Sequence, residues 1–320
     1  MACLLLPLSV LYALVVTLRR YTYQIGLLPR WQAPLPVIVV GNLTVGGTGK
    51  TPLVIWLVQQ LQARGLQVGV VARGYGGQIG RGVQEIYPAC SATLVGDEPL
   101  LIAQRTGAPV VVAAKRARAV ALLCQRYHLD AIIADDGLQH YGLQRDLEFV
   151  VIEGQRRFGN GYWLPAGPLR EGIGRLQSVD ALIVHGGTPE PGELPMQLRL
   201  LNAVNLLTGE QCPVTQLPPA VAMAGIAHPE HFFTLLKQQG VSLQGTTVFR
   251  DHQPYRLAML QSLTLDRQPL LMTEKDAVKC RLFAQTNWWF LPVEAVLPNW
   301  AEEALIQRIM KKIPHGSTTT

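Results

Sequence analysis

Residues 37–52 of the chain read Val37-Ile-Val-Val-Gly-Asn-Leu-Thr-Val-Gly-Gly-Thr-Gly-Lys50-Thr51-Pro52. The apolar residues at the start are β-branched and uninterrupted, which is typical of a buried strand in a parallel sheet. A glycine-rich turn follows, and Lys50 and Thr51 open a stretch that is predicted to be helical. A strand, a glycine loop and a helix in this order indicate a phosphate-binding loop, so a nucleotide site is the first prediction.

The predicted phosphate loop has one departure from the usual pattern. In a loop of this kind the backbone N–H groups and the positive end of the helix face an anion. Lys50 reaches the terminal phosphates, and the Thr51 hydroxyl can bind magnesium. Thr44 stands where the pattern G-x-x-x-x-G-K-[ST] has its first glycine. The alternative is a glycine-rich turn without nucleotide, which the flanking strand and helix count against. The predicted nucleotide-binding residues are Thr44, Val45, Gly46, Gly47, Thr48, Gly49, Lys50 and Thr51.

Length and composition narrow the class of protein. With 320 residues the chain is long enough for two hydrophobic cores. It is 48% hydrophobic and only 16% charged, and its net charge of +6 favours an anionic partner such as a nucleotide or a membrane surface. Nucleic acid is disfavoured because the basic residues are dispersed and form no aromatic-basic platform. The five cysteines are scattered and lack C-x-x-C spacing, so no disulfide framework or zinc site is predicted.

The N-terminal segment carries a membrane signal. Residues 1–18 contain no charged residue, and Arg19 and Arg20 follow directly. As a helix this segment would be about 27 Å long, at the lower limit of a membrane span. It lacks the basic start and small-residue cleavage site of a signal peptide, so we expect it to be retained. The arginines after it favour a cytoplasmic location for the rest of the chain. The alternative is a buried helix of a soluble protein.

From residue 37 onward, predicted strands alternate with predicted helices. Strands are expected at 67–72, 109–113 and 131–134, and helices at 53–63 and 117–127. This alternation implies a parallel sheet that binds ligands at the carboxyl ends of its strands. Asp135 and Asp136 end one such strand. Magnesium in phosphoryl-transfer sites is held by one or two carboxylates and the loop hydroxyl, so Thr51, Asp135 and Asp136 are the predicted metal residues. The alternative is a turn with solvated acids.

Three further stretches leave their role open. Glycines around Tyr75 allow close backbone approach, so this turn could line the site. Asp97 and Glu98 precede Pro99 in a helix-entry context, where acids commonly cap N–H groups. The basic cluster that contains Arg116 is either a solvated face or a site of phosphate recognition.

Six motifs lie along the chain in a fixed order. They are Gly41–Pro52, Arg73-Gly-Tyr-Gly76, Gly96-Asp-Glu-Pro99, Asp135-Asp-Gly-Leu-Gln-His140, Gly167-Pro-Leu-Arg-Glu171 and Thr273-Glu-Lys-Asp-Ala-Val-Lys279. In this order they resemble the tetraacyldisaccharide 4′-kinase family, the lipid A kinases of Gram-negative bacteria. The resemblance covers essentially the whole chain, including the N-terminal helix. That family also lacks the first loop glycine, so Thr44 is no anomaly within it.

The resemblance implies an ATP- and Mg2+-dependent kinase. The acceptor would be the 4′-hydroxyl of a tetraacyldisaccharide 1-phosphate, a lipid A precursor, at the cytoplasmic face of the bacterial inner membrane. By resemblance, Asp97 and His252 form the acid-histidine pair that acts on the hydroxyl. A sugar hydroxyl is a poor nucleophile, and a carboxylate that orients a histidine helps to remove its proton. The candidates on the substrate side are Tyr75, His140, Arg170 and Glu171. No nucleic acid and no obligate protein partner are expected.

The strand and helix pattern restarts after about residue 192. We therefore predict an α/β fold in which a P-loop NTPase-type parallel sheet domain is joined to a smaller α/β domain and carries an N-terminal membrane-associated helix. Asp97 and His252 would then come from opposite domains, so the chemistry would require closure. Lys275 and Asp276 either face the cleft or form an internal salt link.

The expected divisions of the chain are residues 1–30 for the membrane helix and interfacial segment, 31–192 for the P-loop kinase domain and 193–219 for an extended linker. Residues 220–315 are expected to form the second α/β domain, and residues 316–320 a frayed tail.

Two other functional classes fit part of the pattern. A dimeric switch ATPase has an additional lysine in its phosphate loop, but here Val45 occupies that position. A non-catalytic nucleotide-binding scaffold would not need both an acid pair and an aspartate-histidine pair. His228 and His231 have metal-ligand spacing, but they open a predicted helix and have no third ligand nearby in sequence. The sequence therefore favours the lipid kinase.

Overall fold

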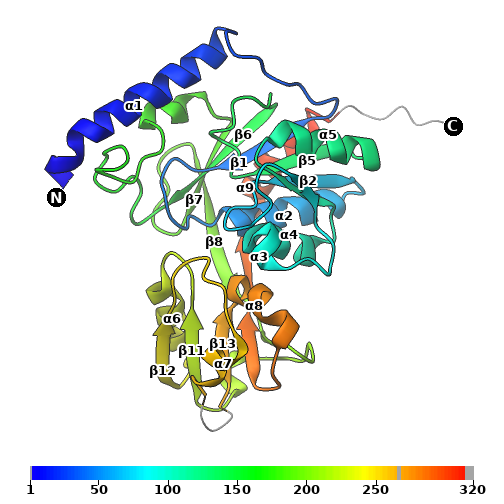
Figure 1. Ribbon diagram of the computed structural model, residues 1–320, viewed down its shortest axis with the longest axis vertical. Coiled ribbons are helices and arrows are strands. Elements are labelled where there is room, and N and C mark those ends of the chain that lie inside the picture. The colour runs from blue at the N-terminus through cyan, green and yellow to red at the C-terminus, as the bar shows by residue number, and fades with distance from the viewer. Residues whose placement is uncertain (1, 265–267, 314–320) are drawn as a thin grey trace.

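The computed structural model describes residues 2–264 and 268–313, and the predicted frayed tail at 316–320 lies outside them. The described residues form two sheets, one above the other in Figure 1. We call the larger sheet with its helices the first unit and the smaller sheet with its helices the second unit.

The larger sheet confirms the predicted parallel architecture. Its strand order is β15-β8-β7-β6-β1-β5-β2-β4-β3, and every pairing from β8 through β4 is parallel. β1 is central and fully buried, so the loop that follows it opens near the middle of one sheet edge. The antiparallel edge strands, β3 and β15, were not predicted. The strands are β1 (Val37–Gly41), β2 (Val68–Ala72), β3 (Val83–Glu85), β4 (Val110–Ala113), β5 (Ala131–Asp135), β6 (Leu147–Glu153), β7 (Ala181–His185), β8 (Glu193–Leu200) and β15 (Val293–Val296).

Helices cover both faces of this sheet. α2 (Lys50–Gln62), α4 (Asp97–Thr106) and α9 (Asn299–Met310) pack in one apolar cluster, and α5 (Arg116–Arg126) packs in the cluster on the other face. The short helix α3 (Ala92–Val95) precedes α4, and the 3-10 helix η1 (Ile173–Ser178) precedes β7. Because Asp97 is the first residue of α4, the packing of this helix on the sheet fixes the position of that carboxylate.

The second unit is a smaller sheet with the order β10-β9-β14-β13-β11-β12. Its strands from β12 to β14 are parallel, and β9 and β10 are antiparallel. The elements are β9 (Ala203–Asn205), β10 (Gln211–Cys212), η2 (Val214–Gln216), β11 (Ala220–Ala224), α6 (Pro229–Gln238), β12 (Leu243–Val248), α7 (Leu257–Gln261), β13 (Leu270–Thr273), α8 (Glu274–Cys280), η3 (Arg281–Phe283) and β14 (Trp288–Leu291).

The structure divides the chain differently from the predicted boundaries. β8 was expected to be part of a linker, but it belongs to the larger sheet. β15 and α9 were assigned to the second domain, but β15 pairs with β8 and the apolar face of α9 joins the core of the first unit. Hydrophobic burial explains the return of the chain, because Ala301, Leu305 and Ile309 are fully buried there. The two units are therefore joined by two neighbouring strands.

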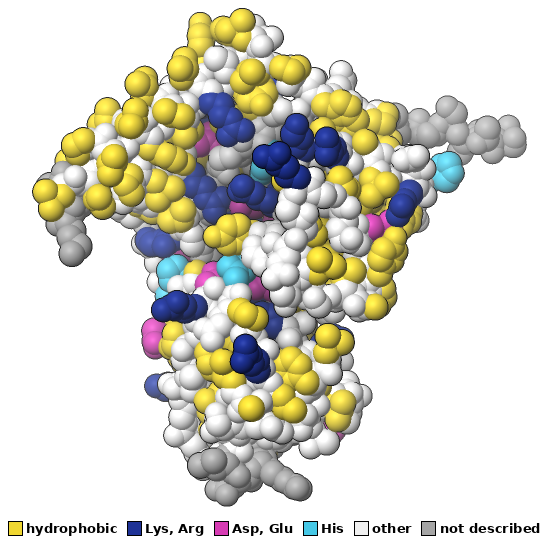
Figure 2. Space-filling view, in the orientation of Figure 1, with side chains coloured by type: hydrophobic (Ala, Val, Ile, Leu, Met, Phe, Trp, Pro, Cys, Tyr) yellow, Lys and Arg dark blue, Asp and Glu magenta, His cyan; other side chains and the backbone are white. Residues whose placement is uncertain are grey.

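α1 (Ala2–Gln24) lies along the outside of the first unit (Figure 1). The Ser9 hydroxyl accepts a hydrogen bond from the Ala166 N–H, and the Tyr12 hydroxyl donates to the carbonyl of Arg170. Near the other end, Arg20 donates to Ser178. The remaining surface of the helix is apolar and exposed, as the hydrophobic side chains along it in Figure 2 show.

If α9 belongs to the first core, truncating it should destabilise the protein. Leu305 is fully buried among residues of the first unit, so Leu305→Ala should lower the free energy of unfolding by about 2–5 kcal/mol. The measurement is urea unfolding. The matched control is Leu282→Ala at an exposed leucine, which should change stability by less than about 0.5 kcal/mol. Equal effects of the two substitutions would contradict the assignment.

Candidate active site

The loop between β1 and α2 has the backbone of a phosphate cradle. Gly46 and Gly49 adopt left-handed φ angles of 102° and 87°, which residues with a Cβ rarely adopt. α2 begins directly at Lys50, so its first N–H groups face the loop. The hydroxyl of Thr48 is buried and has no hydrogen-bond partner among the described residues. Such an unpaired polar group is costly unless a ligand or water satisfies it.

The two acids at the end of β5 have different surroundings. Asp135 is 3% exposed, and its Oδ1 has no hydrogen-bond partner within the described part of the chain. Burial, with help from the nearby carboxylates of Glu98 and Asp136, raises the pKa of Asp135 to about 7. Asp136 instead accepts two hydrogen bonds of 3.0 Å from Arg170 and lies 3.8 Å from Lys50. Burial opposes ionisation of Asp136, but Lys50 and Arg170 outweigh it and lower the pKa.

Asp97 and His252 meet across the boundary between the two units. Nδ1 of His252 lies 3.0 Å from both carboxylate oxygens of Asp97, so the ring N–H donates to the carboxylate. Asp97 is 3% exposed, and although burial raises its pKa, the hydrogen bond from His252 and the charge of Lys275 lower it overall. The same hydrogen bond raises the pKa of His252 against the opposing effect of burial. His252 lies in a turn after β12 with a φ angle of 60°.

Comparison with known proteins places the chain in a family. The model of the tetraacyldisaccharide-1-P 4′-kinase family, LpxK, matches residues 1–313. The chain belongs to this family. The crystal structure of the "apo" form of LpxK from Aquifex aeolicus in complex with ATP covers 98% of this chain and 99% of its own, with 27% identity and a TM-score of 0.81. Two structures of the signal recognition particle receptor FtsY from Elizabethkingia anophelis cover about half of each chain with TM-scores of 0.28 and 0.30, which are too low to indicate a shared fold.

Membership of the LpxK family confirms the predicted fold class and kinase activity. Kinases of this type use ATP with Mg2+. Mg2+ takes oxygen ligands and keeps several waters, so one or two carboxylates suffice beside substrate phosphates. Among residues 2–264 and 268–313, no group of three or more His, Cys, Asp and Glu side chains is arranged to hold a metal ion. The unpaired Oδ1 of Asp135 fits a metal ligand, whereas the role of Thr51 as a second protein donor remains a prediction. Asp136 fits less well because Arg170 already holds both of its oxygens.

The four substrate-side candidates have unequal positions. Tyr75 is 65% exposed and packs edge-on against the His252 ring, with 5.1 Å between ring centroids. His140 is held neutral because burial, with the charges of Arg116 and Arg73, lowers its pKa to about 3. Arg170 bridges Asp136 and the backbone of Leu43. These three remain predictions as substrate contacts.

Glu171, whose role as a substrate contact also remains a prediction, lies inside the protein. It is 2% exposed and accepts hydrogen bonds from Gln139 and the hydroxyl of Tyr141, with Arg175 close by. An internal network therefore occupies the carboxylate and links Glu171 to the segment after β5 and to η1.

Two cations at the site were not assigned a role from the sequence. Arg116 is buried and donates to the backbone carbonyls of Ala113 and Asp135, so the solvated reading of its cluster is wrong for this residue. Arg156 donates to the carbonyl of Val45 and lies 3.4 Å from Nε2 of His228 in the second unit. Neither arginine lies in a pattern that distinguishes it from surface arginines, so only tertiary structure shows these contacts.

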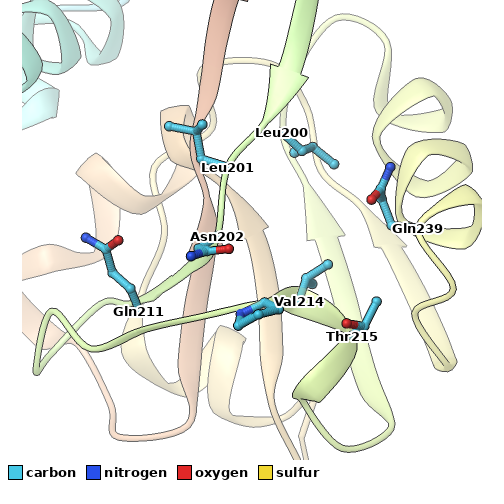
Figure 3. A pocket seen from close by; sticks show the side chains of 8 residues that line it. Leu200, Leu201, Asn202, Gln211, Val214, Thr215 and Gln239 are labelled. Atoms are coloured by element: carbon cyan, nitrogen blue, oxygen red, sulfur yellow. The ribbon is translucent and has the colours of Figure 1, made fainter.

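Histidines mark the junction of the two units. His228 and His231 stack with 5.6 Å between ring centroids, and Figure 2 shows histidine side chains gathered where the units meet. A pocket of about 420 Å3 lies elsewhere, where the chain passes from β8 into the smaller sheet (Figure 3). It shares no residue with the candidate site, so it is not the site of the kinase chemistry.

The different surroundings of the two acids lead to a test of the metal site. Asp135→Asn should weaken the Mg2+-dependent binding of ADP by about tenfold or more, because it replaces one carboxylate oxygen with an NH2 group and removes the negative charge that attracts the cation. Calorimetric titration of ADP with and without Mg2+ measures this directly. Asp136→Asn is the matched control, and it should lose the pairing with Arg170 while keeping most of the Mg2+ effect. If Asp136→Asn weakened the Mg2+-dependent binding of ADP more than Asp135→Asn, the metal ligand would be Asp136 instead.

Proposed function

We propose that the chain transfers the γ-phosphoryl group of ATP to the 4′-hydroxyl of a tetraacyldisaccharide 1-phosphate. Family membership supports the reaction, and the ATP bound in the Aquifex relative supports the donor. The observation that carries the roles of individual residues is the pairing of Asp97 with His252 beside the phosphate loop and the acids of β5. Glu98, next to Asp97, is close enough to raise the pKa of Asp135, so the pair and the acids share one region.

The geometry suggests how the residues divide the work. The acceptor oxygen forms a bond to the γ-phosphorus while the bond from that phosphorus to the β,γ-bridging oxygen breaks and ADP leaves. Nδ1 of His252 is committed to Asp97, so Nε2 is the nitrogen that can receive the hydroxyl proton. Lys50 stabilises charge on the phosphates, and the loop N–H groups hold them in place. Mg2+, when bound, neutralises further phosphate charge.

The contacts of α1 support a location at the membrane surface. α1 is long and apolar enough to cross a membrane, and 6% of its most apolar window is buried. Yet Ser9, Tyr12 and Arg20 attach the helix to the first unit, over a length of about 17 Å at 1.5 Å per residue. A helix held along its length in this way would lie in the membrane interface with its apolar side in the lipid. We therefore place the enzyme on the cytoplasmic face of the inner membrane, where ATP is available.

The proposed reaction is tested by transfer of labelled γ-phosphate to a tetraacyldisaccharide 1-phosphate in detergent micelles with Mg2+. Wild type should form phosphorylated lipid, and Lys50→Ala should reduce the rate about 100-fold or more because it removes a cation at the transferred group. Release of labelled phosphate without phosphorylated lipid would contradict the kinase proposal and favour an ATPase switch.

The interfacial position of α1 is tested by binding to vesicles of anionic phospholipid. Leu11 and Leu14 are more than half exposed, and burying each leucine contributes about 1.5–3 kcal/mol. The double substitution Leu11→Asp and Leu14→Asp should therefore abolish co-sedimentation, while Tyr12→Phe on the attached side should retain it. Alkaline carbonate should release the bound wild type. Resistance to this extraction would indicate a spanning helix instead.

A further inference from the structure

Lys275 joins acidic groups from both units around the catalytic pair. Its ammonium lies 2.9 Å from Glu98 and 3.2 Å from Asp251, and it is 4.0 Å from Asp97. Asp97 and Glu98 open α4 in the first unit, whereas Asp251 precedes His252 in the second. The side chain is 16% exposed, so water screens these interactions less than those of a surface ion pair.

The backbone of Lys275 is held firmly on both sides. On one side, Glu274 accepts hydrogen bonds of 2.7 and 2.9 Å from Arg105, the basic residue in the last turn of α4. On the other side, Asp276 is fully buried and accepts hydrogen bonds from the Gly225 N–H and the Tyr255 hydroxyl. The backbone position of Lys275 is therefore fixed by two neighbours, of which Glu274 binds the first unit and Asp276 binds groups of the second unit.

We infer that Lys275 is a positioning residue for the phosphoryl transfer, which holds the carboxylate of Asp97 and the turn that carries His252 together across the two units. This inference rests on the proposed function. Three carboxylates surround the ammonium of Lys275, so we assign it no direct contact with the acceptor. It acts through Asp97 and His252.

The charges around His252 give this role a distinct signature. The ring faces the carboxylates of Asp97 and Asp251, the ammonium of Lys275 and the uncharged ring of Tyr75. The hydrogen bond and charge of Asp97 raise the pKa of His252, and Lys275 opposes them. Loss of Lys275 should therefore raise this pKa further. Since the proton acceptor must be neutral imidazole, the acid limb of kcat/KM should then move to higher pH.

The experiment compares pH profiles of kcat/KM for the lipid acceptor in Lys275→Met and wild type. We expect the acid limb of Lys275→Met to move up by roughly half to one pH unit and kcat to fall about tenfold. Lys275→Arg, which keeps the charge, should restore the limb to its wild-type position. Asp97→Asn is the control for the opposite direction: loss of its carboxylate should lower the pKa of His252 and move the acid limb to lower pH. Ionisation of ATP and of the lipid phosphate is common to all variants and cancels in the comparison.

Arg105→Met is the matched structural control. It breaks the ion pair of Glu274 but leaves the hydrogen bonds of Asp276, which still hold Lys275 in place, so it should lower the melting temperature without moving the acid limb. An unmoved limb in folded Lys275→Met, or a limb that moves to lower pH, would overturn the inference. If Lys275→Met does not fold, a shifted limb in Lys275→Arg would overturn it as well. Failure of the proposed function is distinguishable, because wild type would then form no phosphorylated lipid.

Discussion

The buried carboxylate of Asp97 is the constraint on which the site depends. A carboxylate that is 3% exposed needs hydrogen bonds and nearby cations to remain ionised, and both of its principal partners come from the other unit. His252 supplies the hydrogen bond and Lys275 the charge. Separation of the units would leave Asp97 without either partner, so the interaction that orients the ring of His252 also favours the arrangement of the units seen here.

Local patterns allowed part of this site to be predicted, because the chemistry there is local in sequence. The strand, glycine loop and helix at 37–52 and the acids after β5 each lie within a few residues. The pair of Asp97 and His252 is different, since 155 residues separate its members. No periodicity or spacing connects them, and resemblance to the family alone implied the pair. Their catalytic roles remain predictions that the experiments above test.

Burial accounts for features that the sequence did not predict. Glu171 and Arg116 carry charges that usually favour an exposed position, yet both are buried with internal hydrogen-bond partners. β15 has only four residues, two of them valine, and its pairing with β8 depends on a surface that forms when the larger sheet assembles. A sequence shows which residues prefer the interior, but it does not show which neighbours will satisfy a charge there.

The connection through β8 and β15 has a consequence for movement. A single peptide linker would allow the two units to swivel freely, because rotation about a few bonds changes their relative orientation. Here two neighbouring hydrogen-bonded strands make the connection, so the relative orientation of the units is restricted at two points of the chain instead of one. A movement of the units would then sample fewer orientations, which favours the return of Asp97, His252 and Lys275 to the contacts seen here. The double connection would thus limit how far Asp97 and His252 can separate.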